Sequence, residues 1–126
     1  MQLHDTGLFR ALALIDGTWR DEELPQETAK DGAFQRADSA FRDRITADGS
    51  SGFKAEPGRY HLYVSLACPW ASRALIFRAI KGLTPMLGVS VTHWLMGREG
   101  WTFDPGDGVV PDSVLGARRL HEIYTH

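Results

Sequence analysis

The sequence predicts an α/β fold built on a single strand–helix–strand unit. Apolar and polar residues alternate over residues 62–66, as they do in a half-buried strand. A helical segment follows from Pro69, where proline is well tolerated because the first helical N–H has no partner to lose. A second apolar strand is expected at residues 87–92. With 126 residues, 43% of them hydrophobic, and a formal net charge of −2, the chain has room for one globular domain at most.

Residues 1–52 are expected to form an irregular extension ahead of this unit. A turn is predicted at Asp16–Thr18. Apolar residues recur at helical spacing over 33–44, although charged residues dominate the opposite face. The Gly- and Ser-rich residues 48–52 indicate a loop. We therefore divide the chain into this extension and an incomplete domain over residues 53–126.

The incomplete domain is introduced by a turn at Pro57–Gly58. Its helix should run to about Lys81, because Gly82 is suited to the left-handed conformation that often ends a helix. Residues 97–112 are rich in Gly, Pro and Asp and are expected to form a surface loop. Apolar spacing predicts a short helix over residues 113–124.

Two strands joined by one helix are too few for a stable domain. A parallel pair exposes a wide apolar face, and independent stability takes three or more strands or good helical cover. The sequence up to His126 supplies neither. We therefore expect the chain either to be a fragment or to borrow the rest of its sheet from a partner.

The only cysteine, Cys68, stands where the first strand gives way to the helix. Unbonded N–H groups and the positive end of the helix dipole favour a thiolate there, and thiolate is the form that attacks disulfides. The dipole alone contributes roughly 0.3–1 kcal/mol, so a stronger effect needs direct hydrogen bonds or a cation such as Arg73. A lone cysteine is also common as a small buried apolar residue. The position of Cys68 alone leaves both interpretations open.

Because the chain has no second cysteine, its redox chemistry is limited to a monothiol mechanism. A dithiol oxidoreductase has its resolving cysteine in a Cys-x-x-Cys motif, and Ala71 occupies that position. A monothiol enzyme instead forms a mixed disulfide with an outside thiol and needs another to release it, which points to an abundant thiol such as glutathione. One cysteine also excludes internal disulfides and cysteine-rich zinc sites, and so favours a reducing cytoplasm.

Composition excludes several other classes of function. No apolar run approaches the roughly 20 residues that span a membrane, so no membrane partner is expected. The balanced charge leaves no basic patch for nucleic acid. His121 and His126 are spaced i, i+5, which does not put two ligands on one helical face, so no metal is expected.

Several motifs occur together in one order along the chain. They are Ile45–Phe53, Gly58–Ala71, Met96–Gly97, Gly100–Phe103 and Leu120–Tyr124. Together they closely resemble the glutathionyl-hydroquinone reductases, the Xi class of glutathione transferases, and the resemblance covers most of the chain. So many separate matches favour a reactive Cys68 over an inert one.

The resemblance implies a partial thioredoxin-like fold, the glutathione-binding amino-terminal domain of a glutathione transferase, without the all-helical domain that follows it in the family. It also implies a homodimer. In such enzymes the cysteine of the Cys-Pro-Trp-Ala motif attacks the sulfur of a glutathionyl-hydroquinone and releases the hydroquinone, and a second glutathione then resolves the mixed disulfide. By motif, Cys68 is the nucleophile and Trp101 lies against glutathione, the co-substrate. Pro69 and Trp70 take positioning roles in the active-site turn.

The sequence departs from the family pattern in two ways. Ser72 stands where the family usually has histidine. The strand with a cis-proline, the Glu-Ser pair that holds the γ-glutamyl group and the helical domain are not in the chain. Three interpretations therefore stay open: a glutathionyl-hydroquinone reductase, a non-catalytic glutathione-binding or dimerisation module, and an inactive truncated fragment.

Overall fold

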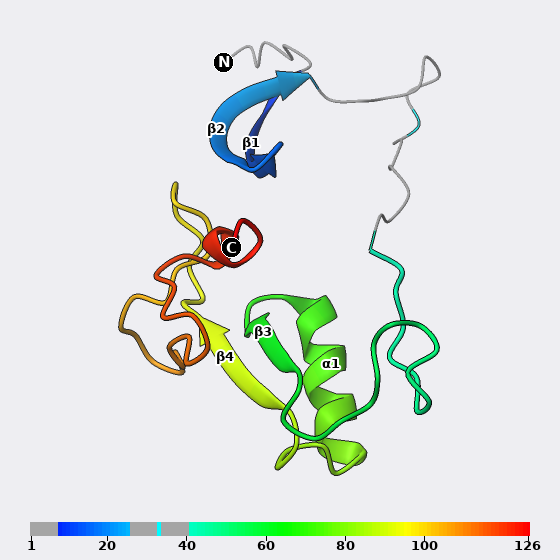
Figure 1. Cartoon of the computed structure of the whole chain (residues 1–126). Coiled ribbons are helices and arrows are strands. Elements are labelled where there is room, and N and C mark those ends of the chain that lie inside the picture. The colour runs from blue at the N-terminus through cyan, green and yellow to red at the C-terminus, as the bar shows by residue number, and fades with distance from the viewer. Residues whose placement is uncertain (1–7, 26–32, 34–40) are drawn as a thin grey trace.

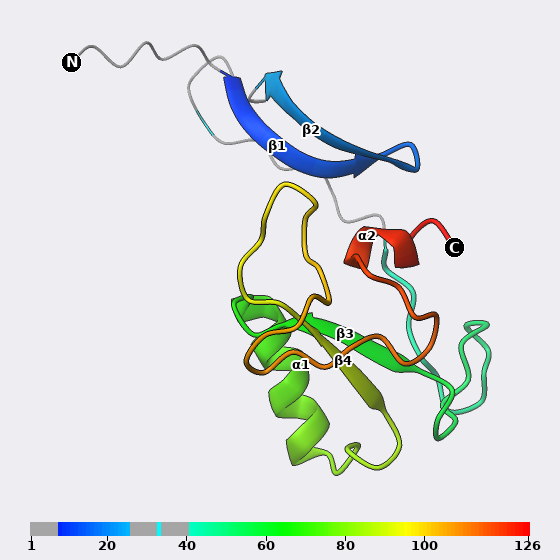
Figure 2. The ribbon, with the colours of Figure 1, turned by 90° about the vertical axis from the view of Figure 1, so that its left-hand side faces the viewer.

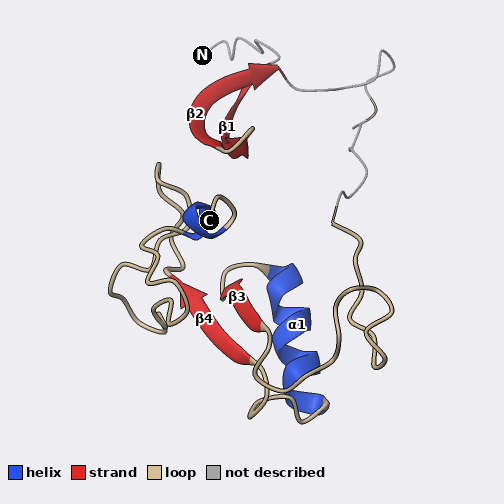
Figure 3. Cartoon of the chain, viewed as in Figure 1, coloured by secondary structure: helices blue, strands red, loops and turns tan. Residues whose placement is uncertain are grey.

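The computed structural model describes residues 8–25, 33 and 41–126 (Figure 1). These residues form two separate two-stranded sheets, one antiparallel and one parallel. In chain order the elements are β1 (Leu8–Ile15), β2 (Thr18–Pro25), β3 (His61–Ser65), α1 (Pro69–Ile80), β4 (Gly88–Thr92) and α2 (Leu120–Ile123). The chain between β4 and α2 is loop (Figure 3).

The predicted strand–helix–strand unit is confirmed. β3 and β4 pair in parallel, from His61 opposite Gly88 to Ser65 opposite Thr92. α1 covers one face of this pair, and the long loop between β4 and α2 covers the other (Figure 1, Figure 2). The apolar core of the described residues is small and consists of Val64, Val91 and Phe103.

α1 begins and ends where the sequence predicts. Pro69 is its first residue, and Gly82, just beyond its end, has a φ of 65° in the left-handed region. The guanidinium of Arg78 donates hydrogen bonds to the carbonyls of Leu87 at 2.7 Å and Thr84 at 3.0 Å. Arg78 therefore ties the end of the helix to the turn that leads into β4.

The extension differs from the irregular segment that we expected, because residues 8–25 form an antiparallel hairpin. The predicted turn is present: Asp16 and Gly17 both have positive φ, 48° and 74°, and join the two strands. A two-residue turn with this backbone matches the right-handed twist of the strands on either side. The helical spacing over 33–44 falls largely outside the described residues, and residues 41–44 are not helical.

The helix predicted over 113–124 is much shorter and covers only Leu120–Ile123. Asp112 and Gly116 explain the difference. The carboxylate of Asp112 accepts hydrogen bonds of 2.9 to 3.2 Å from three backbone amides, those of Val114, Leu115 and Ala117. The bonds from Val114 and Leu115 would also cap a helix, but the bond from Ala117 and the left-handed backbone of Gly116, with a φ of 68°, keep the segment a loop.

The same carboxylate is buried and joins the loop to β3. The hydroxyl of Tyr63 donates a hydrogen bond to Asp112 at 3.0 Å, and the Tyr63 ring lies edge-on to Phe103 with centroids 6.3 Å apart. Burial by itself raises the pKa of Asp112, but the amide and hydroxyl hydrogen bonds outweigh burial and hold this pKa below its ordinary value.

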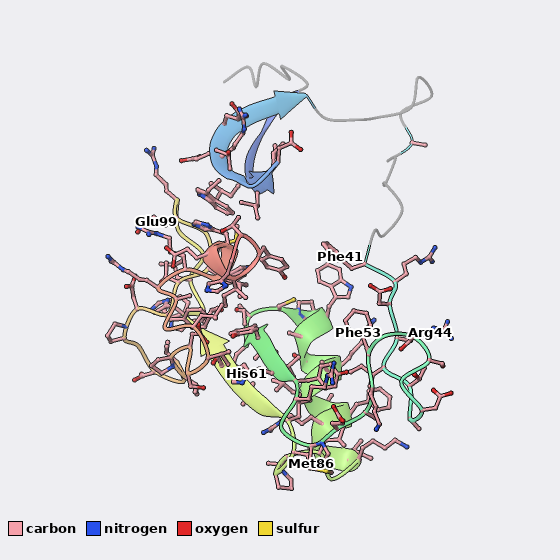
Figure 4. All side chains as sticks on the ribbon, in the orientation of Figure 1. Phe41, Arg44, Phe53, His61, Met86 and Glu99 are labelled. Carbon is pink, nitrogen blue, oxygen red and sulfur yellow. The ribbon has the colours of Figure 1, made fainter. Side chains whose placement is uncertain are left out.

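A second polar contact ties the strands to the loop, at His61 on β3 (Figure 4). Its Nε2 lies 2.8 Å from the hydroxyl of Ser90, which is fully buried and donates to the carbonyl of Pro111 at 3.0 Å. The imidazole also lies close over Gly88, where an added Cβ would approach Nδ1 to 2.6 Å. Hydrogen bonds therefore join both strands to the loop at the adjacent residues Pro111 and Asp112.

Replacing Asp112 with asparagine is expected to destabilise the chain by about 2 kcal/mol at neutral pH. The NH2 group of the asparagine side chain takes the place of a carboxylate oxygen, so buried backbone donors lose their acceptor. A pKa held below its unfolded value contributes stability that is present above the unfolded pKa and is lost as the pH falls through the folded pKa. The difference between wild type and Asp112→Asn should therefore shrink below pH 3.8, the ordinary value for this group. Thermal denaturation of both proteins from neutral to strongly acid pH measures this difference in stability. Asp107→Asn, at an exposed loop position, is the control, and an equal loss for both variants would contradict the expectation.

Tyr63 should be the last tyrosine to ionise. Burial, followed by the hydrogen bond to Asp112 and its negative charge, raises the pKa of Tyr63 from 10.0 to about 12. Absorbance titration should show one phenol with this late ionisation, present in Tyr60→Phe and absent in Tyr63→Phe. Since this pKa is raised, its contribution to stability is complete below pH 10.0 and is lost as the pH rises through about 12. A late ionisation that persists in Tyr63→Phe would show that another group is responsible.

Candidate functional site

Cys68 occupies the junction between β3 and α1. Its amide donates a hydrogen bond to the carbonyl of Ser65 at 3.0 Å, which closes a tight turn after the strand. Its backbone is extended, with φ −94° and ψ 114°, and Pro69 begins the helix, so Cys68 is the N-cap of α1. The thiol is free and half-buried. The predicted place of the cysteine, at the start of a helix, is confirmed.

The first turn of α1 leaves backbone donors near this cysteine. The thiol makes no capping hydrogen bond, and amides of the first helical turn have no partner within the helix. The amide and hydroxyl of Ser72 both donate to the carbonyl of Cys68, at 3.2 and 3.3 Å. Ser72 therefore supports the backbone of the cysteine and not its sulfur. Arg73, the nearest cation in sequence, is exposed and forms no ion pair with any described residue.

Topology brings Trp101 to the same edge of the sheet as Cys68. Because β3 and β4 are parallel, the segments that follow the two strands leave from one edge. Glu99, in the same loop as Trp101, lies at this end of the unit, whereas Met86 lies at the opposite end (Figure 4). Trp101 is half-buried, and within the described part of the chain no hydrogen bond or ring contact joins it to Cys68.

The helix that carries Cys68 exposes an apolar face. The side chains of Trp70, Ile76, Phe77 and Ile80 are all more than half exposed, from 54% at Ile76 to 72% at Ile80. Full burial of such a side chain contributes about 1.5–3 kcal/mol. α1 therefore leaves an apolar surface along its length, and Trp70 is the part of it next to Cys68.

An apolar cavity of about 510 Å³ lies at the other end of α1. Its acidic residue, Glu56, is paired with Arg59 at 2.6 Å and lies 3.9 Å from Lys54. The cavity therefore offers no free charge to a reaction, and it is remote from Cys68. Its lining includes Ile45, Ala55, Pro57, Tyr60, Leu83, Met86 and Leu87.

Within residues 8–25, 33 and 41–126, no three His, Cys, Asp or Glu side chains gather closely enough to hold a metal ion. No helix in the same ranges is both long and apolar enough to cross a bilayer.

Sequence reasoning missed Trp19. Its indole stacks on His121 and donates a hydrogen bond to the carbonyl of Arg98, in the loop that leads to Trp101. The available signal was the Asp16–Gly17 pair, since Asp-Gly directly after a strand-like apolar run is typical of a hairpin. A hairpin prediction would have placed Trp19 on a strand, although not against its partners.

No protein-family model matches the chain. The glutathionyl-hydroquinone reductase PcpF of Sphingobium chlorophenolicum is 52% identical over 112 residues, which are 89% of this chain and 34% of that protein. The chain matches the amino-terminal part of the glutathionyl-hydroquinone reductases. It spans about a third of the length of such a reductase.

Solved structures agree with this match. The Xi-class glutathione transferase from Natrialba magadii has a TM-score of 0.76 and 39% identity, over 94% of this chain and 37% of that one. The glutathione-bound structure of YqjG, a glutathione transferase homologue from Escherichia coli K-12, has a TM-score of 0.65 and 49% identity, over 68% and 30%. The expected fold, part of a Xi-class glutathione transferase, is confirmed. The described residues contain no all-helical domain, and the division of the chain at residue 53 stays a prediction.

Proposed function

We propose that this chain provides the glutathione-reactive thiol of a glutathionyl-hydroquinone reductase, with Cys68 as the nucleophile. The observation that carries the proposal is a free, half-buried cysteine at the N-cap of α1. Backbone amides and the helix dipole at such a position stabilise an anionic sulfur. Two comparisons support the substrate class: a relative 52% identical is named for this reaction, and a similar solved structure holds glutathione.

In the proposed reaction, the Cys68 thiolate attacks the sulfur of a glutathionyl-hydroquinone. An S–S bond forms while the bond from sulfur to the aromatic carbon breaks, and the carbon takes the electron pair and a proton from water. The hydroquinone leaves. A second glutathione thiolate then attacks the glutathione sulfur of the mixed disulfide, which releases oxidised glutathione and restores the thiolate. The carbon is reduced and two glutathione sulfurs are oxidised, so the scheme consumes no metal or further cofactor.

Three other residues have roles in this proposal. Trp101 contacts glutathione, since it follows β4 at the edge where Cys68 follows β3. Pro69 fixes the start of the helix behind the sulfur. Trp70, 68% exposed, positions the substrate beside the thiol. We further propose that the working state is a homodimer. We also propose that the compartment is the cytoplasm, because a free cysteine and a supply of glutathione each fit a reducing environment.

The second candidate is a glutathione-binding or dimerisation module without turnover. The apolar face of α1 favours it, because Ile76, Phe77 and Ile80 are exposed on the helix that carries the thiol. Hydroquinone release from a glutathionyl-hydroquinone separates the two candidates. Release faster than with free glutathione alone excludes the module.

Incubation with oxidised glutathione should place one glutathionyl group on the full chain, because Cys68 is its only cysteine. Intact-mass spectrometry measures the adduct. Cys68→Ser should gain none, and neither should wild type that has first been alkylated. An unmodified wild type, or an adduct that survives in Cys68→Ser, would remove Cys68 from the role of nucleophile.

A further inference from the structure

The β1–β2 hairpin contacts the loop before Trp101 through two residues of β2: Asp21, whose carboxylate lies 3.8 Å from the guanidinium of Arg98, and Trp19, which pairs with Leu14 inside the hairpin. The indole N–H donates a hydrogen bond to the carbonyl of Arg98 at 2.9 Å. The ring stacks on His121, with centroids 4.6 Å apart and planes inclined by 12°. Figure 2 shows the hairpin lying above this loop and α2. One side chain therefore joins three segments that are distant in the sequence.

Gly100 leaves the room that this indole needs. A Cβ at this position would lie 2.7 Å from the Trp19 ring, and the glycine has a φ of 75° in the left-handed region. Its amide donates to the carbonyl of Gly97 at 3.0 Å and closes the turn. The tight turn and the close approach of Trp19 therefore depend on the same glycine.

The turn that Trp19 contacts leads directly into Trp101. The carbonyl of Trp101 accepts a hydrogen bond from the amide of Leu120 at 2.8 Å, and the side chain of Arg119 forms an ion pair with Glu99. α2 and the residue before it therefore anchor this loop on one side. Trp19 supplies the anchor on the other side, so the backbone of Trp101 is fixed between the two.

We propose that Trp19 is a positioning residue for glutathione: it holds the turn over residues 97–100 and so sets the backbone from which Trp101 contacts the tripeptide. The inference rests on the proposed function, which supplies the role of Trp101. Trp19 itself touches no substrate in this scheme. Its loss weakens recognition of glutathione and spares the reactivity of the sulfur, because Cys68 belongs to the β3–α1 junction whereas Trp19 contacts Arg98 and His121.

The test compares two disulfides on the full chain. Oxidised glutathione carries the tripeptide, and 4,4′-dithiodipyridine is a small disulfide without it. Each reacts with Cys68 by the same exchange, in which an S–S bond to the cysteine forms while the S–S bond of the reagent breaks and one thiolate leaves. Rates of modification over a range of concentrations give the half-saturating concentration of oxidised glutathione.

Trp19→Ala is expected to raise that concentration about tenfold, as the loss of a hydrogen bond and a ring contact would, and to leave the rate with dithiodipyridine unchanged. Trp19→Phe keeps a ring that can stack on His121 but lacks the N–H donor. Its half-saturating concentration should lie between those of wild type and Trp19→Ala. Thr18→Ala, exposed on the same strand, is the matched control and should equal wild type. Trp19→Ala added to Trp101→Ala should cause no further rise, because Trp19 acts through Trp101.

An equal change with both disulfides would overturn the inference, since the hairpin would then support the fold in general. An unchanged half-saturating concentration in Trp19→Ala would also overturn it while leaving the proposed function in place. If wild type neither saturates with oxidised glutathione nor gains an adduct, the proposed function fails and this inference fails with it. Circular dichroism checks folding, and Trp19→Phe carries the comparison if Trp19→Ala does not fold.

Discussion

Parallel pairing of β3 with β4 is the constraint on which the rest of the structure depends. Two parallel strands need a long crossover, so α1 lies between them in the sequence and on one face of the pair. Parallel strands also end at the same edge. The helix start with Cys68 and the loop with Trp101 are therefore neighbours by topology, before any side chain is considered. One helix covers only one face, and the other face is left to a loop.

A loop that covers a sheet must satisfy its own backbone groups, because a buried unpaired N–H or C=O is costly. Asp112 and Ser90 do so with side-chain hydrogen bonds, and Val91 and Val110 exchange two backbone hydrogen bonds of 2.9 and 3.0 Å. The buried polar residues Ser65, Ser90, Thr92 and Asp112 are as prominent as the three buried apolar ones. This part of the chain is therefore held by hydrogen bonds as much as by an apolar core.

The strand–helix–strand unit and the place of the cysteine could be predicted from sequence because their signals are local, above all Pro69 and Gly82. The hairpin was missed because neither strand alternates: β1 is almost wholly apolar and β2 has four consecutive charged residues, although the Asp-Gly turn was visible. The prediction of a helix over 113–124 was wrong because Gly116 adopts a left-handed backbone and the amide of Ala117 bonds to the side chain of Asp112. The contact of Trp19 with Gly100 joins distant segments, and no local pattern carries such information.

The contact between His61 and Ser90 also determines which nitrogen of the uncharged imidazole carries the hydrogen. A serine hydroxyl has one hydrogen, and that of Ser90 points at the carbonyl of Pro111, which can only accept. The oxygen of Ser90 must then receive a hydrogen from Nε2 of His61, so the uncharged imidazole is confined to a single tautomer. Bond dipoles consequently run in one direction, from ring through hydroxyl to carbonyl. The single hydroxyl of Ser90 therefore satisfies two other polar groups. In Ser90→Ala, Nε2 of His61 would lose its acceptor and the carbonyl of Pro111 would lose its donor.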